Sequence, residues 1–157
     1  MNKSTQQVLF SSKTSKWSTP QDFYNKLHAI YNFTLDPCAS DENHKCEKYF
    51  TEKDDGLSQS WEGERVFMNP PYGRNVKTWI RKAYEESMKP DTIVVCLLAS
   101  RTDTRWFYDY CMKAEKISFV KGRLKFGGNK NPAPFPSCVV VFRNSPTTNP
   151  KVDAMLP

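Results

Sequence analysis

The sequence lacks several features that would assign it at once to a common class of protein. No run approaches the roughly 20 apolar residues of a membrane-spanning helix, which excludes a helical membrane protein. The first residues, MNKSTQQVLFSSK, lack the apolar core of a secretory signal, so we expect a cytoplasmic protein. The chain has no internal repeat and no low-complexity tract, so a repeat array is not indicated.

Cysteine is present in a pattern that argues against a disulfide framework. The five cysteines are odd in number and scattered, and they contain no C-x-x-C pair. This pattern is typical of reduced thiols in a reducing compartment. Cys38, His44 and Cys46 could supply three metal ligands, but no fourth ligand follows at a matching spacing. We therefore predict no metal site.

The composition instead favours one globular domain. The chain has 157 residues, 38% of them hydrophobic, and includes 10 Phe, 7 Tyr and 4 Trp, enough to bury a core. Its net charge of +6 and pI of about 9.1 are compatible with a polyanionic partner. A soluble basic surface explains the same charge equally well, so charge does not decide between the two.

The spacing of apolar residues predicts helices and strands that alternate along the chain. The helices are predicted over residues 20–31, 75–88 and 104–112, and the strands over 33–36, 65–68, 92–99, 116–120 and 137–143. We expect Thr19 to cap the first helix and Pro20 to occupy its first position. The alternation indicates an α/β fold with a mostly parallel sheet and an antiparallel edge. Residues 1–16 are predicted to form a flexible arm, 17–143 a single domain and 144–157 a disordered tail.

Three polar segments each follow a predicted strand. They are Asp36-Pro37, Asn69-Pro70-Pro71-Tyr72 and Ser100-Arg101-Thr102-Asp103. Ligands of open α/β sheets bind beyond the carboxyl ends of the strands. We therefore expect these segments to line one rim.

The stretch VFMNPPYGR, residues 66–74, ends a strand with a rigid corner. Pro70 and Pro71 have fixed φ and no N–H, so the corner presents carbonyl oxygens, and Asn69 is biased toward extended backbone. The Asn69 amide oxygen and the Pro70 carbonyl form a pair of acceptors that matches a planar NH2 group. Tyr72 offers an aromatic face for a flat base. The competing interpretation is a strand-ending turn with a packed tyrosine.

These residues resemble the catalytic [DNS]-P-P-[YFW] motif of amino methyltransferases, and the match extends to the small phage and prophage DNA adenine-N6 methyltransferases. The blocks that carry the resemblance are WSTPQDFYNKL, FTLDPCAS, ENHKCEKYFT, DDGL, VFMNPPYGR, LLASRTDTRWF, FVKGRLKFGG and APFPS, over about residues 16–143. The resemblance implies an abbreviated Rossmann-like fold of mixed, mostly parallel sheet. It also implies methyl transfer from S-adenosylmethionine to adenine N6 in double-stranded DNA. A phage or prophage enzyme in the bacterial cytoplasm, with no obligatory protein partner, would protect DNA from restriction.

The resemblance also implies roles for individual residues. Asn69, Pro70 and Pro71 form the catalytic corner that binds the target amino group, and Tyr72 stacks on the base. The cofactor-binding positions would be Thr19, Pro20, Asp36, Pro37, Ala39, Ser40, Asp54 and Asp55. Thr19-Pro20 would equally serve as a plain helix cap, and Asp54-Asp55-Gly56 as a solvated turn. The turn after Asp36 carries Ala39 and Ser40 where the family usually has glycine.

DNA contacts are expected from basic and aromatic residues near the same rim. These are Arg74, Arg101, Arg105, Lys121, Arg123 and Lys125, with Phe126 and Phe135 as candidates to wedge into the base stack or sandwich a flipped base. Any single basic residue is as readily a solvated charge, but the group favours a phosphate-binding face.

Other functions use the same corner. Cytosine N4, an RNA adenine and a protein glutamine each present an amino group on a planar carbon. A catalytically silent DNA-binding module is a further alternative, and the intact Asn69–Tyr72 motif argues against it.

Overall fold

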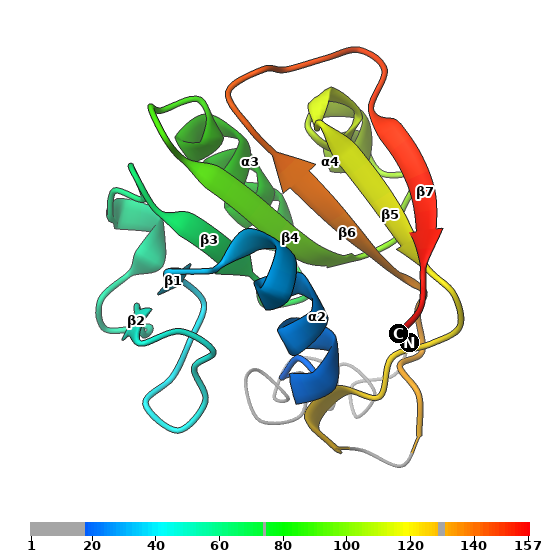
Figure 1. The fold of residues 1–157 in the computed structure, drawn as a ribbon, viewed down its shortest axis with the longest axis horizontal. Coiled ribbons are helices and arrows are strands. Elements are labelled where there is room, and N and C mark those ends of the chain that lie inside the picture. The colour runs from blue at the N-terminus through cyan, green and yellow to red at the C-terminus, as the bar shows by residue number, and fades with distance from the viewer. Residues whose placement is uncertain (1–17, 74, 129–130) are drawn as a thin grey trace.

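The computed structural model describes residues 18–73, 75–128 and 131–157, which form a sheet with helices on both faces (Figure 1). The helices are α2 (Gln21–Tyr31), α3 (Val76–Ser87) and α4 (Arg105–Asp109), with 3-10 turns η1 (Gly56–Ser58), η2 (Cys111–Lys113) and η3 (Phe126–Gly128). The strands are β1 (Leu35–Asp36), β2 (Lys48–Tyr49), β3 (Arg65–Met68), β4 (Ile93–Ala99), β5 (Lys116–Val120), β6 (Ser137–Phe142) and β7 (Lys151–Met155). No helix within these described ranges is long and apolar enough to cross a membrane.

The strands of the described residues form one seven-stranded sheet in the order β2-β1-β3-β4-β6-β5-β7. All neighbouring pairs are parallel except the two that involve β6, which runs antiparallel to both β4 and β5. The mostly parallel α/β sheet is therefore confirmed, but the antiparallel strand lies inside the sheet and not at its edge. The reason is burial: all six residues of β6 are buried, which an edge strand would not allow.

The C-terminal residues differ from the prediction of a disordered tail. Residues 151–155 form β7, which pairs in parallel with β5 along its whole length. The Lys116 Nζ lies 3.0 Å from Asp153 Oδ2 across this pair, and Lys26 of α2 donates to the Pro157 carbonyl at 2.7 Å. Backbone pairing compensates for the exposed side chains of this strand. The predicted arm, residues 1–16, lies outside the described residues.

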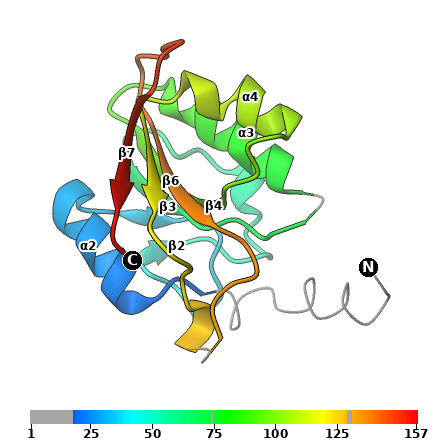
Figure 2. The ribbon, with the colours of Figure 1, turned by 90° about the vertical axis from the view of Figure 1, so that its right-hand side faces the viewer.

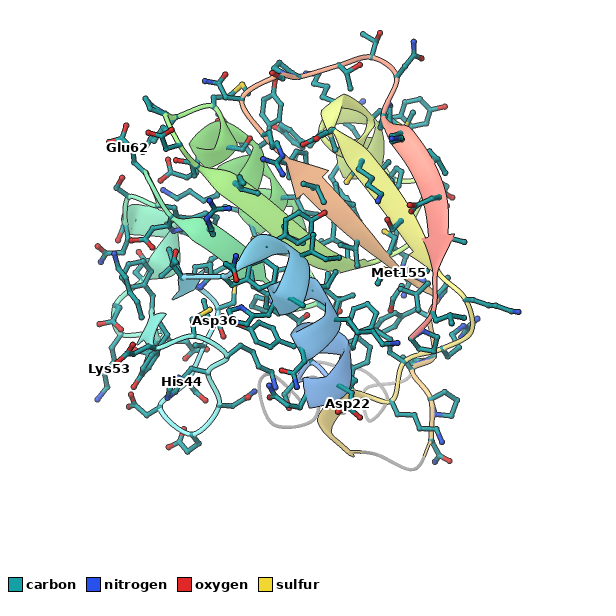
Figure 3. All side chains as sticks on the ribbon, viewed as in Figure 1. Asp22, Asp36, His44, Lys53, Glu62 and Met155 are labelled. Carbon is teal, nitrogen blue, oxygen red and sulfur yellow. The ribbon has the colours of Figure 1, made fainter. Side chains whose placement is uncertain are left out.

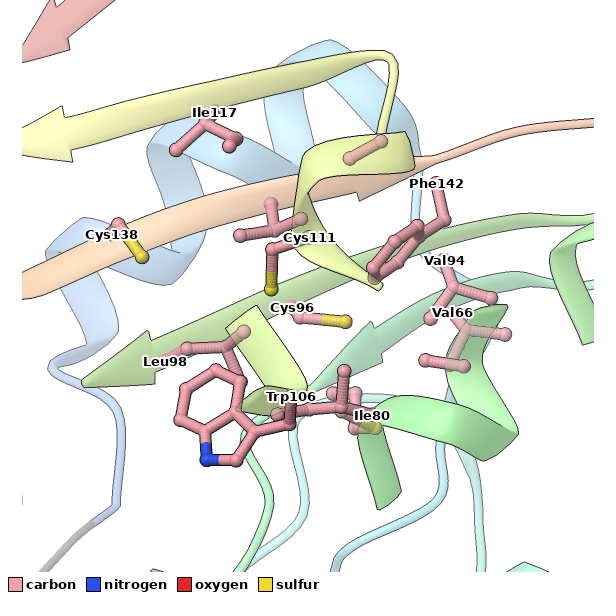
Figure 4. Packing of buried hydrophobic residues seen from close by; sticks show 14 of the residues in the cluster. Val66, Ile80, Val94, Cys96, Leu98, Trp106, Cys111, Ile117, Cys138 and Phe142 are labelled. Carbon is pink, nitrogen blue, oxygen red and sulfur yellow. The ribbon is translucent and has the colours of Figure 1, made fainter. Parts of the chain in front are cut away.

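The helices divide between the two faces of the sheet. Figure 2 shows α2 on one side and α3 with α4 on the other. Alternate residues of the central strands follow the same division: Val94 and Cys96 pack toward α3 and α4, whereas Val95 packs toward α2. Figure 4 shows the first of these layers, in which Ile80 and Trp106 cover the strands. Coverage on both faces explains why the buried strands are continuous apolar runs.

The start of α2 also departs from the prediction. The helix begins at Gln21, with Pro20 in the N-cap position at φ −54° and ψ 132°. The Thr19 side chain, predicted as the cap, is buried and directed at another segment of the chain, as described below. By contrast, α4 has a side-chain cap: Thr104 accepts from the Phe107 N–H.

Candidate active site

Asn69 lies directly after β3, at the rim where the parallel strands β1, β3 and β4 end. The two following prolines end the strand; Pro70 is buried and Pro71 is exposed. The Asn69 amide is held at both ends by side chains. Its Nδ2 donates to Thr19 Oγ1 at 3.1 Å, and its Oδ1 accepts from the Tyr72 hydroxyl at 3.2 Å.

The Tyr72 ring packs into an aromatic cluster. Its centroid lies 4.9 Å from that of Phe135 and 6.2 Å from that of Phe126, and the latter contact is edge-on. Burial raises the pKa of the Tyr72 hydroxyl well above its usual value of 10, so the group stays protonated and able to donate. The expected use of this ring, stacking on a base, is not tested by this arrangement.

The two phenylalanines that were predicted to contact DNA are buried in this structure. Phe126 is 1% exposed and Phe135 4% exposed, and both belong to the core cluster beneath α2. Packing the two rings against Tyr72 removes a large apolar area from water. In this structure the rings of Phe126 and Phe135 both pack against the Tyr72 ring.

A cavity of about 270 Å³ opens beside Asn69. It is lined by the turn after β1, the turn that leads into η1, and the catalytic corner with the first turn of α3. The lining residues are Pro37, Cys38, Ala39, Thr51, Glu52, Asp55, Gly56, Leu57, Asn69, Pro71, Asn75 and Trp79. The predicted convergence of the Asp36-Pro37 and Asn69–Tyr72 segments on one rim is therefore observed. The third segment begins at the same end of the sheet, because Ser100 directly follows β4, which runs parallel to β3.

Asp36 organises the turn after β1. It is 6% exposed, and its carboxylate accepts from the Cys38 N–H at 3.2 Å and the Lys45 N–H at 2.9 Å. Burial raises the pKa of Asp36, and the two backbone hydrogen bonds oppose that rise. The described lining of the cavity includes Pro37 and Ala39 but not Asp36 or Ser40. Figure 3 shows Asp36 at the end of β1, beside the loop that carries His44.

The structure separates the two neighbouring aspartates. Asp54 Oδ2 accepts from the N–H and the hydroxyl of Thr51, at 2.9 and 3.1 Å, which closes a turn. Asp55 lines the cavity and has a left-handed backbone with φ 54°. Gly56 follows at a close approach, because a Cβ there would lie 2.4 Å from the Pro37 carbonyl oxygen. The two turns that wall the cavity are thus in direct contact.

The predicted basic residues are exposed around the rim. The Arg101 guanidinium lies 5.9 Å from the centroid of the Phe135 ring, and Arg123 donates to the Ala133 carbonyl at 3.2 Å. Arg105, Lys121 and Lys125 are exposed, whereas Arg74 lies outside the described residues. Arg101 and Arg123 are therefore held near the aromatic cluster that supports Tyr72.

Several cavity residues were not predicted from the sequence. Trp79 is the largest of them, and it lies one helical turn after Asn75 on the same face of α3. That spacing was a usable signal, since α3 begins directly after the catalytic corner. Thr51, Glu52 and Leu57 carried no comparable signal. Within the described residues, no three His, Cys, Asp or Glu side chains gather as metal ligands would.

Comparison of the sequence with known proteins identifies a family to which the chain is similar. The family model described as "DNA N-6-adenine-methyltransferase (Dam)" matches residues 6–151. A "DNA N-6-adenine-methyltransferase" of Haemophilus phage HP1 (strain HP1c1) is 31% identical over 118 residues, which cover 73% of this chain and 67% of that protein.

Two further relatives match over parts of their lengths. A "DNA N-6-adenine-methyltransferase" of Escherichia phage T1 is 32% identical over 110 residues, 69% of this chain, and the chain spans about half of that protein (45%). A "Putative methyltransferase YfdM" of Escherichia coli (strain K12) is 32% identical over 65 residues, 36% of this chain and 70% of that protein. The match of the family model over most of the sequence shows that the chain belongs to the DNA N-6-adenine-methyltransferase (Dam) family.

Proposed function

We propose that this protein transfers a methyl group from S-adenosylmethionine to the N6 amino group of adenine in double-stranded DNA. One observation carries the proposal: the catalytic corner and the candidate cofactor turns open into the same cavity. Asn69 and Pro71 line it from one side, and Pro37, Asp55 and Gly56 line it from the other. A methyl donor and an amino acceptor held on these two sides would meet without any movement of the sheet.

The chain's own residues would act on the target amine. The Asn69 amide oxygen and the Pro70 carbonyl oxygen are the two acceptors that we propose for the target amino group. Two acceptors on one NH2 group draw the nitrogen lone pair out of conjugation with the ring, so the nitrogen becomes more nucleophilic. After transfer, the extra proton on nitrogen is released to water.

The cavity residues fit the chemistry of the proposed cofactor. When bound, S-adenosylmethionine supplies a methyl group on a sulfonium whose leaving group is a neutral thioether. The Asp55 carboxylate would accept from the adenine amino group, and the Trp79 ring would cover a flat base. Pro37 and Ala39 would approach the cofactor through their backbone. A volume of about 270 Å³ is near the lower end of small-molecule pockets, roughly 300 Å³.

DNA would bind across the basic rim. A base paired inside a duplex cannot reach Asn69, so it must be flipped out at a cost of a few kcal/mol. Arg101, Arg105 and Arg123, with Lys121, Lys125 and Arg74, would contact phosphates and hold the duplex in register. We infer action on DNA in the cytoplasm of a bacterial host, where a phage-type enzyme would protect its targets from restriction.

The test is transfer of a labelled methyl group to unmethylated duplex DNA, followed by nucleoside analysis. We expect N6-methyladenine, with transfer abolished by Asn69→Ala while cofactor binding measured by calorimetry survives. Methylcytosine, methylated RNA or methylated protein as the sole product would overturn the substrate assignment. Loss of folding and cofactor binding together in Asn69→Ala would instead show that the corner is structural. Digestion of the methylated DNA with adenine-sensitive endonucleases would test protection and report the target sequence.

A further inference from the structure

Thr19 belongs to a segment that the resemblance associates with the cofactor, yet its hydroxyl contacts a different partner. The residue is 4% exposed, and its Oγ1 accepts from Asn69 Nδ2 at 3.1 Å. The described lining of the cavity does not include Thr19. The Thr19 hydroxyl therefore contacts the Asn69 amide, and Thr19 does not line the cavity proposed for the cofactor.

We propose that Thr19 is a positioning residue that, together with the Tyr72 hydroxyl, clamps the Asn69 amide in the orientation required for methyl transfer. The proposal rests on the proposed function, because it assigns the amide oxygen to the target amino group. It differs from the role implied by the family resemblance, in which Thr19 contacts the cofactor.

The clamp addresses a specific weakness of asparagine. The terminal torsion of asparagine is broad, and the two ends of the amide are nearly identical in shape. A free amide would sweep a wide arc, and a flipped one would point its NH2 group at the substrate NH2 group, placing donor against donor. Partners at both ends restrict this freedom: Thr19 holds Nδ2, and Tyr72 holds Oδ1 at 3.2 Å.

Both clamping groups are themselves fixed by the fold. The Ser18 carbonyl, one residue before Thr19, accepts from the Gly127 N–H at 2.9 Å. Gly127 follows Phe126, whose ring packs edge-on against Tyr72. The segment before α2, the catalytic corner and the η3 turn therefore form a closed set of contacts around Asn69. Such a preorganised acceptor needs little rearrangement when the substrate arrives.

The test compares variants that remove one hydroxyl and keep the shape of the side chain. Thr19→Val is isosteric and leaves Nδ2 without this acceptor, Thr19→Ser restores the hydroxyl, and Tyr72→Phe removes the donor at the other end. Thr92→Val is the matched control. Thr92 is 3% exposed and also hydrogen-bonded, but it precedes β4 and so lies at the end of this strand that is opposite to the candidate site.

Three measurements separate the possible roles. The first is kcat and KM for duplex DNA, the second is the Kd of S-adenosylmethionine by calorimetry, and the third is the NMR signal and hydrogen exchange of the Asn69 side-chain amide. We expect Thr19→Val and Tyr72→Phe each to lower kcat by about five- to tenfold, the effect of one lost hydrogen bond. The Kd should change less than about twofold, and the Asn69 amide protons should shift and exchange faster. Thr19→Ser should recover most of kcat.

Different outcomes distinguish a failed clamp from a failed function. A raised cofactor Kd with an unchanged Asn69 amide signal would make Thr19 a cofactor contact and overturn the proposal. Wild-type behaviour of both Thr19→Val and Tyr72→Phe would overturn it as well, as would an equal loss of kcat in Thr92→Val. If the wild-type protein methylates no DNA adenine, the proposed function fails, while the amide signal and its exchange still decide whether the clamp exists. Should Thr19→Val not fold, Tyr72→Phe tests the same clamp from its other end.

Discussion

Replacing Gly56 by alanine should damage the cavity proposed for the cofactor more than it damages the fold. The new Cβ would lie 2.4 Å from the Pro37 carbonyl oxygen and 3.1 Å from the Trp79 ring, whereas ordinary contact begins at 3.4 Å. One wall of the cavity must therefore move by about 1 Å. The Gly56 turn cannot simply retreat, because its carbonyl accepts a buried hydrogen bond from Trp61 Nε1 at 3.0 Å.

The magnitude follows from these contacts. Forcing a methyl group into a packed site costs about 1–3 kcal/mol, and a protein of this size loses about 2–4 °C of melting temperature per kcal/mol. The expected decrease in Tm is therefore about 2–12 °C. Because Asp55 moves with Gly56, the hydrogen bond proposed between Asp55 and the cofactor should be lost. Hydrogen bonds to charged groups are worth about 1.5–3 kcal/mol, so cofactor affinity should fall by at least about tenfold.

Gly63→Ala is the matched control. Gly63 has a left-handed φ of 78° with open space around its missing side chain, and it lies before β3, at the end of the strand opposite to Asn69. Alanine there costs about 1–2 kcal/mol of backbone strain without touching the cavity. Calorimetry with S-adenosylmethionine and thermal unfolding would be measured on both variants. Unchanged affinity in Gly56→Ala, or an equal loss of affinity in Gly63→Ala, would refute the reasoning.

Two further predictions concern acidic residues. Asp55→Asn should weaken cofactor binding by about tenfold or more and leave folding intact, since asparagine tolerates the left-handed backbone. Asp54→Asn should leave the cofactor affinity unchanged. If calorimetry gives the reverse result, the wrong aspartate was assigned to the cofactor. For Glu86, burial raises the pKa of the carboxyl, but hydrogen bonds from Lys89 and the Trp61 N–H outweigh it and lower the pKa below the usual 4.5. Its contribution to stability is therefore present above about pH 4.5 and lost as pH falls through the lower folded-state pKa. Glu86→Gln should flatten the curve of Tm against pH below about pH 4.5. If the curve in that pH range is unchanged in the variant, Glu86 is not the group that loses stability there.

The strands and helices were largely readable because their burial leaves a periodic or continuous pattern. The strand predicted at 65–68 and the strand at 116–120 have the observed bounds, and the helix predicted at 75–88 differs by one residue at each end. The order of strands in the sheet was harder, because an apolar run records burial and not its neighbours. For β6, the prediction placed the antiparallel strand at the edge of the sheet, whereas all six residues are buried and the strand lies between β4 and β5. β7 left no such pattern, since its residues are mostly exposed and it is held by backbone pairing with β5.

The candidate site was readable where a single segment carries its chemistry. The Asn69 corner is such a segment, and the structure places it on the cavity as expected. The contact of Asn69 with Thr19 joins residues 50 positions apart, and neither segment contains a pattern that predicts this contact. The burial of Phe126 could not be predicted either, because it depends on packing with Tyr72, which lies far away in the sequence.

The way in which a short chain builds this site explains which polar residues it needs. β1 and β2 have two residues each, so the sheet itself supplies little of the cavity wall. Side chains hold the turns instead: Asp36 binds the N–H groups of the turn after β1, Asp54 closes the next turn, and Trp61 anchors the Gly56 carbonyl. An acid that is buried for this purpose, such as Asp36, costs desolvation that only its hydrogen bonds offset. The acidic residues around the cavity therefore divide into Asp36 and Asp54, which hold the turns, and Glu52 and Asp55, which line the space within.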